Sequence, residues 1–452
     1  MIIGSEESKF ELYERFNSVN AVDQDLYGRY DVKRGLRNAD GTGVLAGVTN
    51  ISNVHGYLVS DGVKIPDEGS LFYRGYELYD LIGSTEDDRR FRYEEIAYLL
   101  LLGDLPTRDE LDLFISVLDS QRELPDGFIA SILMRDTPPD LMNILARSIL
   151  LLYSYDSDLE SRAVEHEIHT AISLISRLPR IMVASYYSKQ AKFAGGSMIL
   201  HPFISGQSTA ETILSMLRLD RQFTPEEARM LDIMLCLHAE HGGGNNSTFT
   251  TRVLSSADTD PYSTYAAAIG SLKGSRHGGA NHKIRAMQAE VKREVKNWDN
   301  DDEVADYLCR IVRKEAFDKT GLIYGMGHAV YTKSDPRAVI CKRFAKGLAE
   351  GTEFEREFML LEAIERLSPQ ILRDVKGTTK DVCANVDMYS GLVYSMLGIP
   401  EDIFTPLFAC ARMAGWAAHR FEEIVSGRRI IRPAYKATFG IGPREYKTIS
   451  ER

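Results

Sequence analysis

The hydrophobic and polar positions follow a helical period through most of the chain, with apolar residues recurring at spacings of three and four. Thr107 and Thr224 each precede a glutamate by three residues, which is the capping-box pattern, and Pro225 occupies the first helical position after Thr224. These signals predict helices that begin just after both threonines. The second helix is expected to continue until Gly242 stops it.

Two further helices are predicted in the second half of the chain. Pro336 opens the run RAVICKRFAKGLAE, which closes at Gly351. A helix rich in Ala and Phe is expected over 403–419. The hydrophilic interval 290–304 is typical of a solvated helix end followed by a loop.

Strand patterns are few and lie near the N-terminus. The stretches GVLAGVTNISNVHGYLV and GSLFYRGY contain short apolar and β-branched runs divided by Gly and Asp. No repeat of fixed period and no low-complexity tract interrupts the helical pattern. The sequence therefore predicts a mainly α protein with a small β-containing N-terminal segment.

Composition narrows the class of protein. The net charge of −11 over 452 residues argues against a protein that coats nucleic acid or an anionic membrane. The five cysteines are odd in number and form no C-x-x-C pair, which favours reduced thiols. No apolar run approaches the ~20 residues that span a bilayer, and the first residues lack a signal or transit pattern. We expect a cytoplasmic protein.

Histidines flanked by glycine are the first candidates for chemistry. His238 and His241 stand three residues apart at a predicted helix end, where a capping role is an open alternative. A zinc site is weakly indicated, because HAEH is not the H-E-x-x-H pattern. His277 lies in GSRHGGAN, where glycines let backbone approach a ligand, although a turn between helices also explains the segment.

Two charged residues sit at predicted helix starts. Arg337 follows His328 in GMGHAVYTKSDPR, and a cation is locally unfavourable at a helix N-terminus. An anion bound between His328 and Arg337 would explain both, whereas a solvated surface arginine is the alternative. Asp387 precedes an apolar helix, so it is either a functional carboxylate or an N-cap.

Arg412 is the sole formal charge between Asp402 and His419, on an otherwise apolar helix. A buried guanidinium needs a partner, and its planar group matches a carboxylate, although an internal salt bridge or a snorkelling side chain is the alternative. Arg432 taken alone is an ordinary surface charge. Together, three arginines and two or three histidines suit a small polycarboxylate, with a carboxylate and an imidazole left for acid–base work.

At these residues the sequence resembles the citrate synthase family. Four motifs match in order: LHAEHGGGNNSTFTTRV, AAAIGSLKGSRHGGAN, GMGHAVYTKSDPR, and NVDMYSG followed by FACARMAGWAAHRFEE and IRP. The resemblance runs from about residue 45 to the C-terminus. It implies a multi-helical fold of two domains, with 1–278 and 391–452 in a large domain and 279–390 in a small one. Hinges are expected near HGGAN and NVD.

The resemblance implies an activity, the condensation of acetyl-CoA with oxaloacetate to give citrate and CoA, with no metal or cofactor. Asp387 would remove a methyl proton from acetyl-CoA. His277 would stabilise the developing oxyanion at the thioester oxygen. His328 would polarise the ketone of oxaloacetate.

The resemblance also assigns the binding of oxaloacetate. His241, Arg337 and Arg412 would hold its carboxylates. Arg432 matches an arginine that the neighbouring subunit contributes, which implies a homodimer. Small-molecule substrates are the expected partners, with neither nucleic acid nor membrane.

The sequence departs from the family pattern at two positions. Ser275 stands where many members have proline before the catalytic histidine. Thr332 stands where some relatives carry an arginine for a CoA phosphate. Lys333, Lys376 and Lys380 are the candidate sources of that positive charge.

Three other functions stay open at this point. A 2-methylcitrate synthase would use propionyl-CoA, and one methyl group changes binding by only ~1–3 kcal/mol. A metal hydrolase would use the histidine pairs and would lose activity on chelation. A non-catalytic helical scaffold would release no CoA.

Overall fold

The computed structural model describes residues 13–16, 20–38, 40–60, 63–83, 91–159, 161, 163–378, 380–427, 429–438 and 445–451. The chain forms two compact units, Met1–Ala46 with Arg432–Arg452, and Gly47–Ile431. The expected domain boundaries at 279 and 390 fall within the larger unit and stay a prediction.

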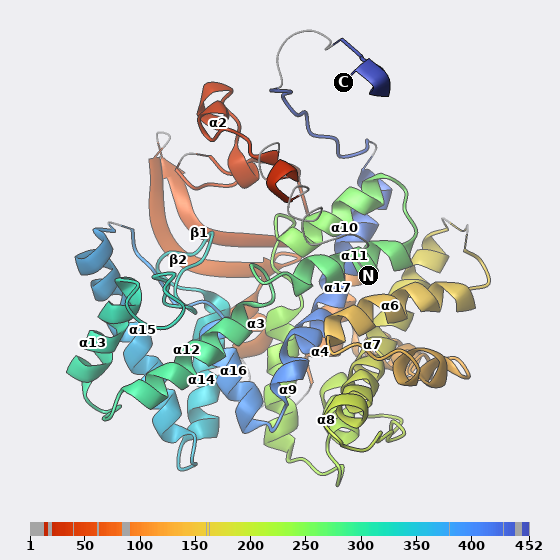
Figure 1. Cartoon of the computed structure of the whole chain (residues 1–452). Coiled ribbons are helices and arrows are strands. Elements are labelled where there is room, and N and C mark those ends of the chain that lie inside the picture. Colours follow the sequence, from red (N-terminus) through yellow and green to blue (C-terminus); the bar gives the residue numbers. More distant parts are fainter. Residues whose placement is uncertain are drawn as a thin grey trace. The chain divides into compact units, whose positions relative to one another are not determined.

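The larger unit is mainly helical, as predicted (Figure 1). No helix of the described residues is long and apolar enough to cross a membrane. The helices and short 3-10 or π segments of this unit are α3 (Leu78–Gly83), α4 (Tyr93–Leu102), α5 (Arg108–Ser120), η2 (Ile129–Met134), α6 (Leu141–Leu152), η3 (Tyr153–Tyr155), α7 (Val164–Phe193), α8 (Thr209–Leu217), α9 (Pro225–His238), α10 (Asn246–Ser256), α11 (Pro261–Lys273), α12 (Ala280–Glu294), α13 (Asp301–Val312), α14 (Pro336–Ala349), α15 (Glu355–Lys376), α16 (Asp387–Met396), η4 (Glu401–Ile403) and α17 (Phe404–Ser426).

The smaller unit contains only short elements in its described residues. They are α2 (Asp25–Arg29), η1 (Arg34–Leu36) and η5 (Ile449–Glu451). Arg432, which begins the C-terminal segment of this unit, is exposed.

The predicted β segment near the N-terminus is confirmed as a three-stranded antiparallel sheet. Its strands are β1 (Ser52–Ser60), β2 (Val63–Tyr73) and β3 (Tyr76–Glu77), in the order β1-β2-β3. The register of β1 against β2 shifts between His55 and Tyr57, which marks a bulge. The two long strands form the curved orange hairpin in Figure 1.

Both predicted capping boxes are present, at the starts of α5 and α9. The end of α9 was predicted incorrectly, because the helix stops at His238 rather than continuing to Gly242. The hydroxyl of Tyr73 donates to the carbonyls of Cys236 and Glu240, at 3.2 and 3.0 Å. A tertiary contact from β2 therefore accompanies the end of this helix, and His241 lies in the turn that follows.

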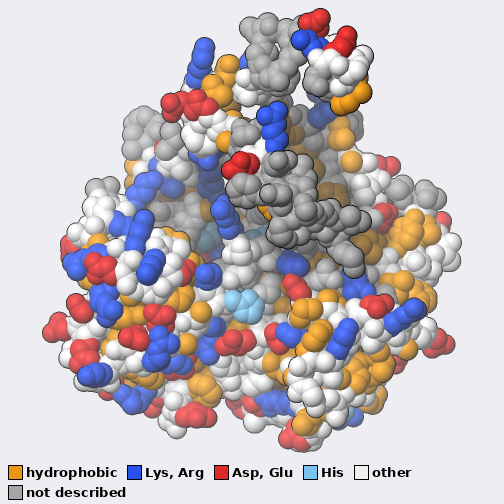
Figure 2. Space-filling view, viewed as in Figure 1, with side chains coloured by type: hydrophobic (Ala, Val, Ile, Leu, Met, Phe, Trp, Pro, Cys, Tyr) orange, Lys and Arg blue, Asp and Glu red, His pale blue; other side chains and the backbone are white. Residues whose placement is uncertain are grey.

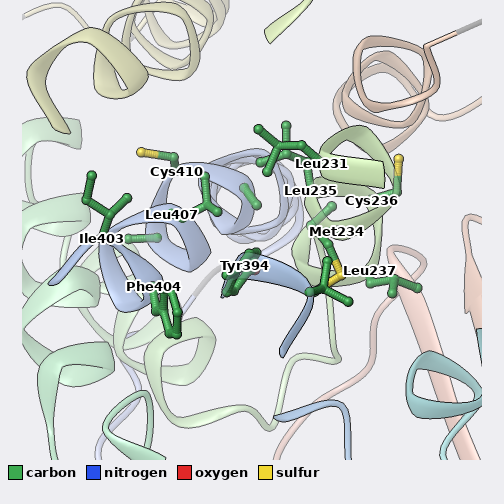
Figure 3. Packing of buried hydrophobic residues seen from close by; sticks show 14 of the residues in the cluster. Leu231, Met234, Leu235, Cys236, Leu237, Tyr394, Ile403, Phe404, Leu407 and Cys410 are labelled. Carbon is green, nitrogen blue, oxygen red and sulfur yellow. The ribbon is translucent and has the colours of Figure 1, made fainter. Parts of the chain in front are cut away.

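Helix α17 lies at the centre of the larger unit. It packs against α4, α7, α9, α10 and α11 (Figure 1). The helix expected over 403–419 is present, and it extends to Ser426. Figure 3 shows Tyr394 of α16 between Phe404 of α17 and the side chains of α9, with the Tyr394 and Phe404 rings 4.9 Å apart between centroids. This packing brings α9, α16 and α17 together.

Helix α14 begins at Pro336 as predicted. Gly351 follows its cap with a φ of +72°, a conformation that glycine adopts without strain. The hydrophilic interval 290–304 is the end of α12, a loop and the start of α13, also as predicted.

Candidate active site

One cavity of about 330 Å³ collects candidate residues from segments far apart in the sequence. On the face drawn in Figure 2, acidic and basic side chains are interspersed and a histidine (pale blue) shows near the centre. Six predicted site residues line the cavity: His241, His277, His328, Arg337, Asp387 and Arg412. The other polar lining residues include His238, Asn245, Arg276, Asn281, Asn385 and Thr405.

Backbone contacts fix the imidazole of His328. Its Nδ1 accepts the backbone N–H groups of Val330 and Tyr331, at 3.1 and 3.2 Å. Because Nδ1 is an acceptor, Nε2 carries the proton of the ring and is its donor. Gly325 and Gly327, with φ of +90° and +95°, provide the turns that carry this segment.

His241 is buried next to His328. The two rings meet edge to face at 5.0 Å between centroids, and Tyr331 stacks on His328 at 4.6 Å. Burial and the positive charge of Arg337 lower the pKa of His241 well below its usual value. Its Nε2 is buried and has no hydrogen-bond partner among the described residues. His241 is therefore a neutral ring with one nitrogen available to a ligand.

His277 lies in the turn before α12. A Cβ at Gly278 would stand 2.4 Å from the carbonyl oxygen of Leu272, so only glycine fits this turn. The Nε2 of His277 lies 3.2 Å from the hydroxyl of Ser247, which also accepts from Trp416 Nε1 at 3.1 Å. Burial, with Arg412 nearby, lowers the pKa of His277 to about 4. At neutral pH this ring is an uncharged hydrogen-bonding group.

Asp387 is the first residue of α16, and the alternative that it is an N-cap is wrong. The N-cap is Val386, while the Oδ1 of Asn385 accepts the backbone N–H of Asp387 at 3.1 Å. Burial raises the pKa of Asp387 to about 6, and the opposing effects of Arg337 and an Asn281 hydrogen bond keep it from rising further. A carboxylate that titrates close to neutral pH suits a general base.

Arg337 is paired with the residue that caps its own helix. Its Nε donates to Asp335 Oδ1 at 3.1 Å and its Nη2 to Oδ2 at 2.7 Å, and both side chains are buried. Asp335 also accepts the backbone N–H of Arg337 at 3.0 Å. Asp335 therefore offsets the charge of Arg337 at this helix start, and no bound anion is needed to explain a cation there, while anion binding by Arg337 stays a prediction. The guanidinium still lines the cavity.

Arg412 is fully buried, and its terminal nitrogens are open. Its Nε donates to the carbonyl of His238 at 2.6 Å, and its guanidinium lies over the Phe408 ring at 4.8 Å. Nη1 and Nη2 have no hydrogen-bond partner in the described part of the chain, and no salt bridge to Arg412 occurs there. Burial lowers the pKa of Arg412 to about 10, which leaves it cationic at neutral pH. Neither a salt bridge nor snorkelling describes this residue.

The remaining predicted residues do not line the cavity. Lys333, Lys376 and Lys380 are exposed, and Lys376 donates to the carbonyl of Gly321. Among the described residues, no three His, Cys, Asp or Glu side chains are grouped so as to hold a metal ion.

Several lining residues were missed in the sequence. Arg276, which directly precedes His277, is exposed and reaches the cavity. Its place beside a glycine-flanked histidine was the available signal. Asn245 and Asn281 carry no such signal, because asparagine near a turn or helix start is ordinary.

Comparisons with known proteins define the class. Residues 38–434 match the family described as "Citrate synthase, C-terminal domain". The citrate synthase of Haloferax volcanii is 33% identical over 430 residues, which cover 93% of this chain and 99% of that protein. The 2-methylcitrate synthase 1 of Corynebacterium glutamicum is 30% identical over 425 residues, which cover 93% of this chain and 98% of that protein.

Solved structures agree with the sequence relatives. The ternary complex of Thermoplasma acidophilum citrate synthase with carboxymethyl coenzyme A and oxaloacetate superposes with a TM-score of 0.74 at 26% identity, covering 93% of this chain and 99% of that one. The citrate synthase of Pyrobaculum aerophilum gives 0.73 at 28% identity, covering 90% and 94%. The fold and sequence define an enzyme that transfers an acyl group. The chain belongs to the citrate synthase family.

Proposed function

We propose that the protein condenses acetyl-CoA with oxaloacetate and hydrolyses the resulting citryl-CoA to citrate and CoA. The observation that carries the proposal is the open pair of Arg412 nitrogens, buried in the same cavity as Asp387 and His277. Two unpaired guanidinium donors in a buried site match a carboxylate, and the reaction's keto-diacid supplies two carboxylates.

Oxaloacetate would be held by the groups at the base of the cavity. Arg412 would donate to one carboxylate through Nη1 and Nη2, while Arg337 and His241 would hold the other. The Nε2 proton of His328 would donate to the ketone oxygen, which makes the ketone carbon more electrophilic.

Acetyl-CoA would be activated by Asp387 and His277. Asp387 takes a proton from the methyl group, and the electrons of that C–H bond move into the thioester as an enolate. A hydrogen bond from His277 to the thioester oxygen stabilises the charge, and one such donor is typically worth ~3–4 kcal/mol. The carbon then attacks the ketone carbon, and the ketone oxygen takes the proton that His328 Nε2 donates. Water then cleaves the thioester of citryl-CoA, which releases citrate and the thiol of CoA.

Assembly and closure complete the proposal. We place Arg432 of a neighbouring subunit at the site of a homodimer, and Lys333, Lys376 and Lys380 near the CoA phosphates. The segment 279–390 would close over the substrates, which would exclude water until condensation has occurred.

Propionyl-CoA is the second candidate substrate, and a specific observation favours it. Two relatives from Corynebacterium glutamicum, each 30% identical, are 2-methylcitrate synthases. The same cavity residues would serve this reaction, because the extra methyl group lies next to the reacting carbon. The ratio of kcat/KM for acetyl-CoA and propionyl-CoA decides between the two.

Free-thiol release tests the proposal. The purified protein is assayed with acetyl-CoA in the presence and absence of oxaloacetate, and we expect release that depends on oxaloacetate. Asp387→Ala should lower turnover by roughly 10²–10⁴-fold, the usual contribution of a general base. Asp381→Ala, which removes an exposed carboxylate nearby in sequence, should leave turnover unchanged. Undiminished activity of Asp387→Ala would refute the proposed base.

A further inference from the structure

Glu240 is a fully buried carboxylate that does not line the cavity. It directly precedes His241. Its Oε1 accepts from the hydroxyl of Ser52 at 2.8 Å, from the backbone N–H of Gly242, and from His419 Nε2 at 2.9 Å. Its Oε2 has no hydrogen-bond partner among the described residues. One oxygen is therefore tied down and the other is not.

His419 holds Glu240 through a hydrogen bond from its Nε2. Arg252 donates to the Nδ1 of His419 from Nε at 3.2 Å and from Nη2 at 2.8 Å. Nδ1 is thus an acceptor, and the ring's proton on Nε2 points to Glu240. Arg252 itself is paired with Glu422 and Glu423. Arg252, His419 and Glu240 thus form a hydrogen-bonded series, called the relay below. It orients the imidazole of His419, and the negative charge stays on Glu240.

The carboxylate of Glu240 lies against the face of α17 that carries Arg412. Gly415 is three residues after Arg412, so the two positions share a face of the helix. A Cβ at Gly415 would collide with Glu240 Oε2 and with the carbonyl of Ala239. Burial alone would raise the pKa of Glu240, but the hydrogen bonds from His419 and Ser52 and the positive charge of Arg412 lower it. The group is therefore ionised beside the buried guanidinium.

We infer that Glu240 is a positioning residue that serves as a built-in counter-charge for Arg412. It offsets the buried guanidinium when no substrate is bound, while Ser52, Gly242 and His419 hold it away from Nη1 and Nη2. A buried cation with no counter-charge is strongly destabilising, whereas a direct ion pair would compete with a substrate carboxylate. Glu240 is close enough to Arg412 to offset its charge. Because its hydrogen bonds keep it from pairing with Nη1 and Nη2, those nitrogens stay open to a substrate carboxylate. The role in substrate binding rests on the proposed function.

Glu240→Gln tests this inference because it removes the charge and keeps the shape and the acceptor oxygen. We expect the thermal unfolding midpoint of the unliganded protein to fall. We also expect the Kd for oxaloacetate, measured by calorimetry without CoA, to tighten about threefold or more, since the substrate no longer shares Arg412 with a carboxylate. Glu423→Gln is the matched control, because it removes the same charge from the Arg252 end of the relay. Its Kd should stay that of the wild type.

A double-variant cycle separates the charge pair from a general packing role. Glu240→Gln should lower the unfolding midpoint in the wild-type background and have little effect in an Arg412→Met background. If Glu240→Gln alone does not fold, recovery of folding in the double variant supports the inference, and failure of the double variant overturns it. Weaker oxaloacetate binding by Glu240→Gln, or an equal loss of midpoint in both backgrounds, also overturns it. Absence of oxaloacetate binding by the wild type would instead sink the proposed function, while the stability cycle would still test the charge pair.

Discussion

Asp387 and His277, which both line the cavity, have opposite pKa shifts. Burial raises the pKa of Asp387 to about 6, yet it lowers the pKa of His277 to about 4, because burial disfavours the charged form of each group. Near neutral pH the carboxylate is ionised and the imidazole is neutral. An ionised carboxylate and an uncharged imidazole that line one cavity are the combination that the proposed proton removal next to a carbonyl would require.

The first prediction concerns the pH dependence of this base. Protonation of Asp387 removes the proton acceptor, so kcat/KM for acetyl-CoA should fall about tenfold per pH unit below an apparent pKa of about 6. Bound oxaloacetate adds negative charge, which would move that value upward. His277 stays neutral throughout this range and should add no second step.

The measurement is a pH–rate profile at saturating oxaloacetate, from about pH 5 to 8. Asp387→Glu, if it retains measurable activity, should shift the acid limb, because it changes the base and not its surroundings. A profile that stays flat down to pH 5 would contradict the assignment of Asp387.

Sequence patterns predicted which residues line the cavity, but they did not predict the hydrogen-bond and ion-pair partners of those residues. Arg412 could be predicted because it interrupts a long apolar helix, and burial of that helix was the natural expectation. Asp335 was not singled out in the sequence, although it pairs with Arg337 and caps α14. Glu240 was passed over between two histidines. A single sequence does not show which acid lies beside which buried cation, because those pairs depend on tertiary packing.

The β hairpin is the element that supports the loop carrying His328. The backbone N–H of Gly69 on β2 donates to the Ser334 hydroxyl at 3.0 Å, and that hydroxyl donates to Glu68 at 2.7 Å. Gly56 on β1 lies against the backbone of Val330 and Tyr331. The sequence predicted the strands but not this role. Local capping signals likewise fixed where α5 and α9 begin, while the early end of α9 coincides with a contact from Tyr73, which lies far away in sequence.

The second prediction is that Gly69→Ala disturbs the site from outside the cavity. A Cβ at this position would stand 2.0 Å from the carbonyl oxygen of Ser334, so the loop leading to Arg337 must move. We expect kcat/KM for oxaloacetate to fall at least about tenfold, since a displacement of about 1 Å can cost far more. The unfolding midpoint should fall as well.

Gly347→Ala is the matched control for that substitution. Gly347 lies within α14, is exposed, and has open space around its missing Cβ. Alanine there should raise stability by roughly 0.5–1 kcal/mol and leave the kinetics unchanged. Wild-type kinetics in Gly69→Ala would show that the hairpin does not position the loop.

Within the larger unit, Gly47–Ile431, the cavity gathers residues from five separate stretches of sequence, 238–245, 272–281, 327–337, 385–394 and 404–412. Arg432 belongs to the other unit, in a C-terminal segment grouped with Met1–Ala46. The whole chain carries a net charge of −11, so the arginines that gather in this cavity give it a positive charge that the rest of the protein does not share. In the proposed homodimer, each subunit would supply Arg432 to the neighbouring site. That contact to an oxaloacetate carboxylate would then come from a different subunit than Asp387.

The third prediction tests that exchange with two inactive variants. Arg432→Ala retains Asp387, and Asp387→Asn retains Arg432, so each homodimer should be nearly inactive. In a hybrid dimer, one site combines the intact Asp387 of the first subunit with the intact Arg432 of the second. Random reassociation of an equal mixture makes about half of the dimers hybrid, and each hybrid has one working site, so the mixture should regain about a quarter of wild-type activity. Co-expression with two affinity tags isolates the doubly tagged hybrids, in which one of the two sites works, so their thiol release should be about half that of the wild type. A hybrid fraction no more active than the separate variants, or full activity of Arg432→Ala alone, would show that Arg432 does not serve the neighbouring site.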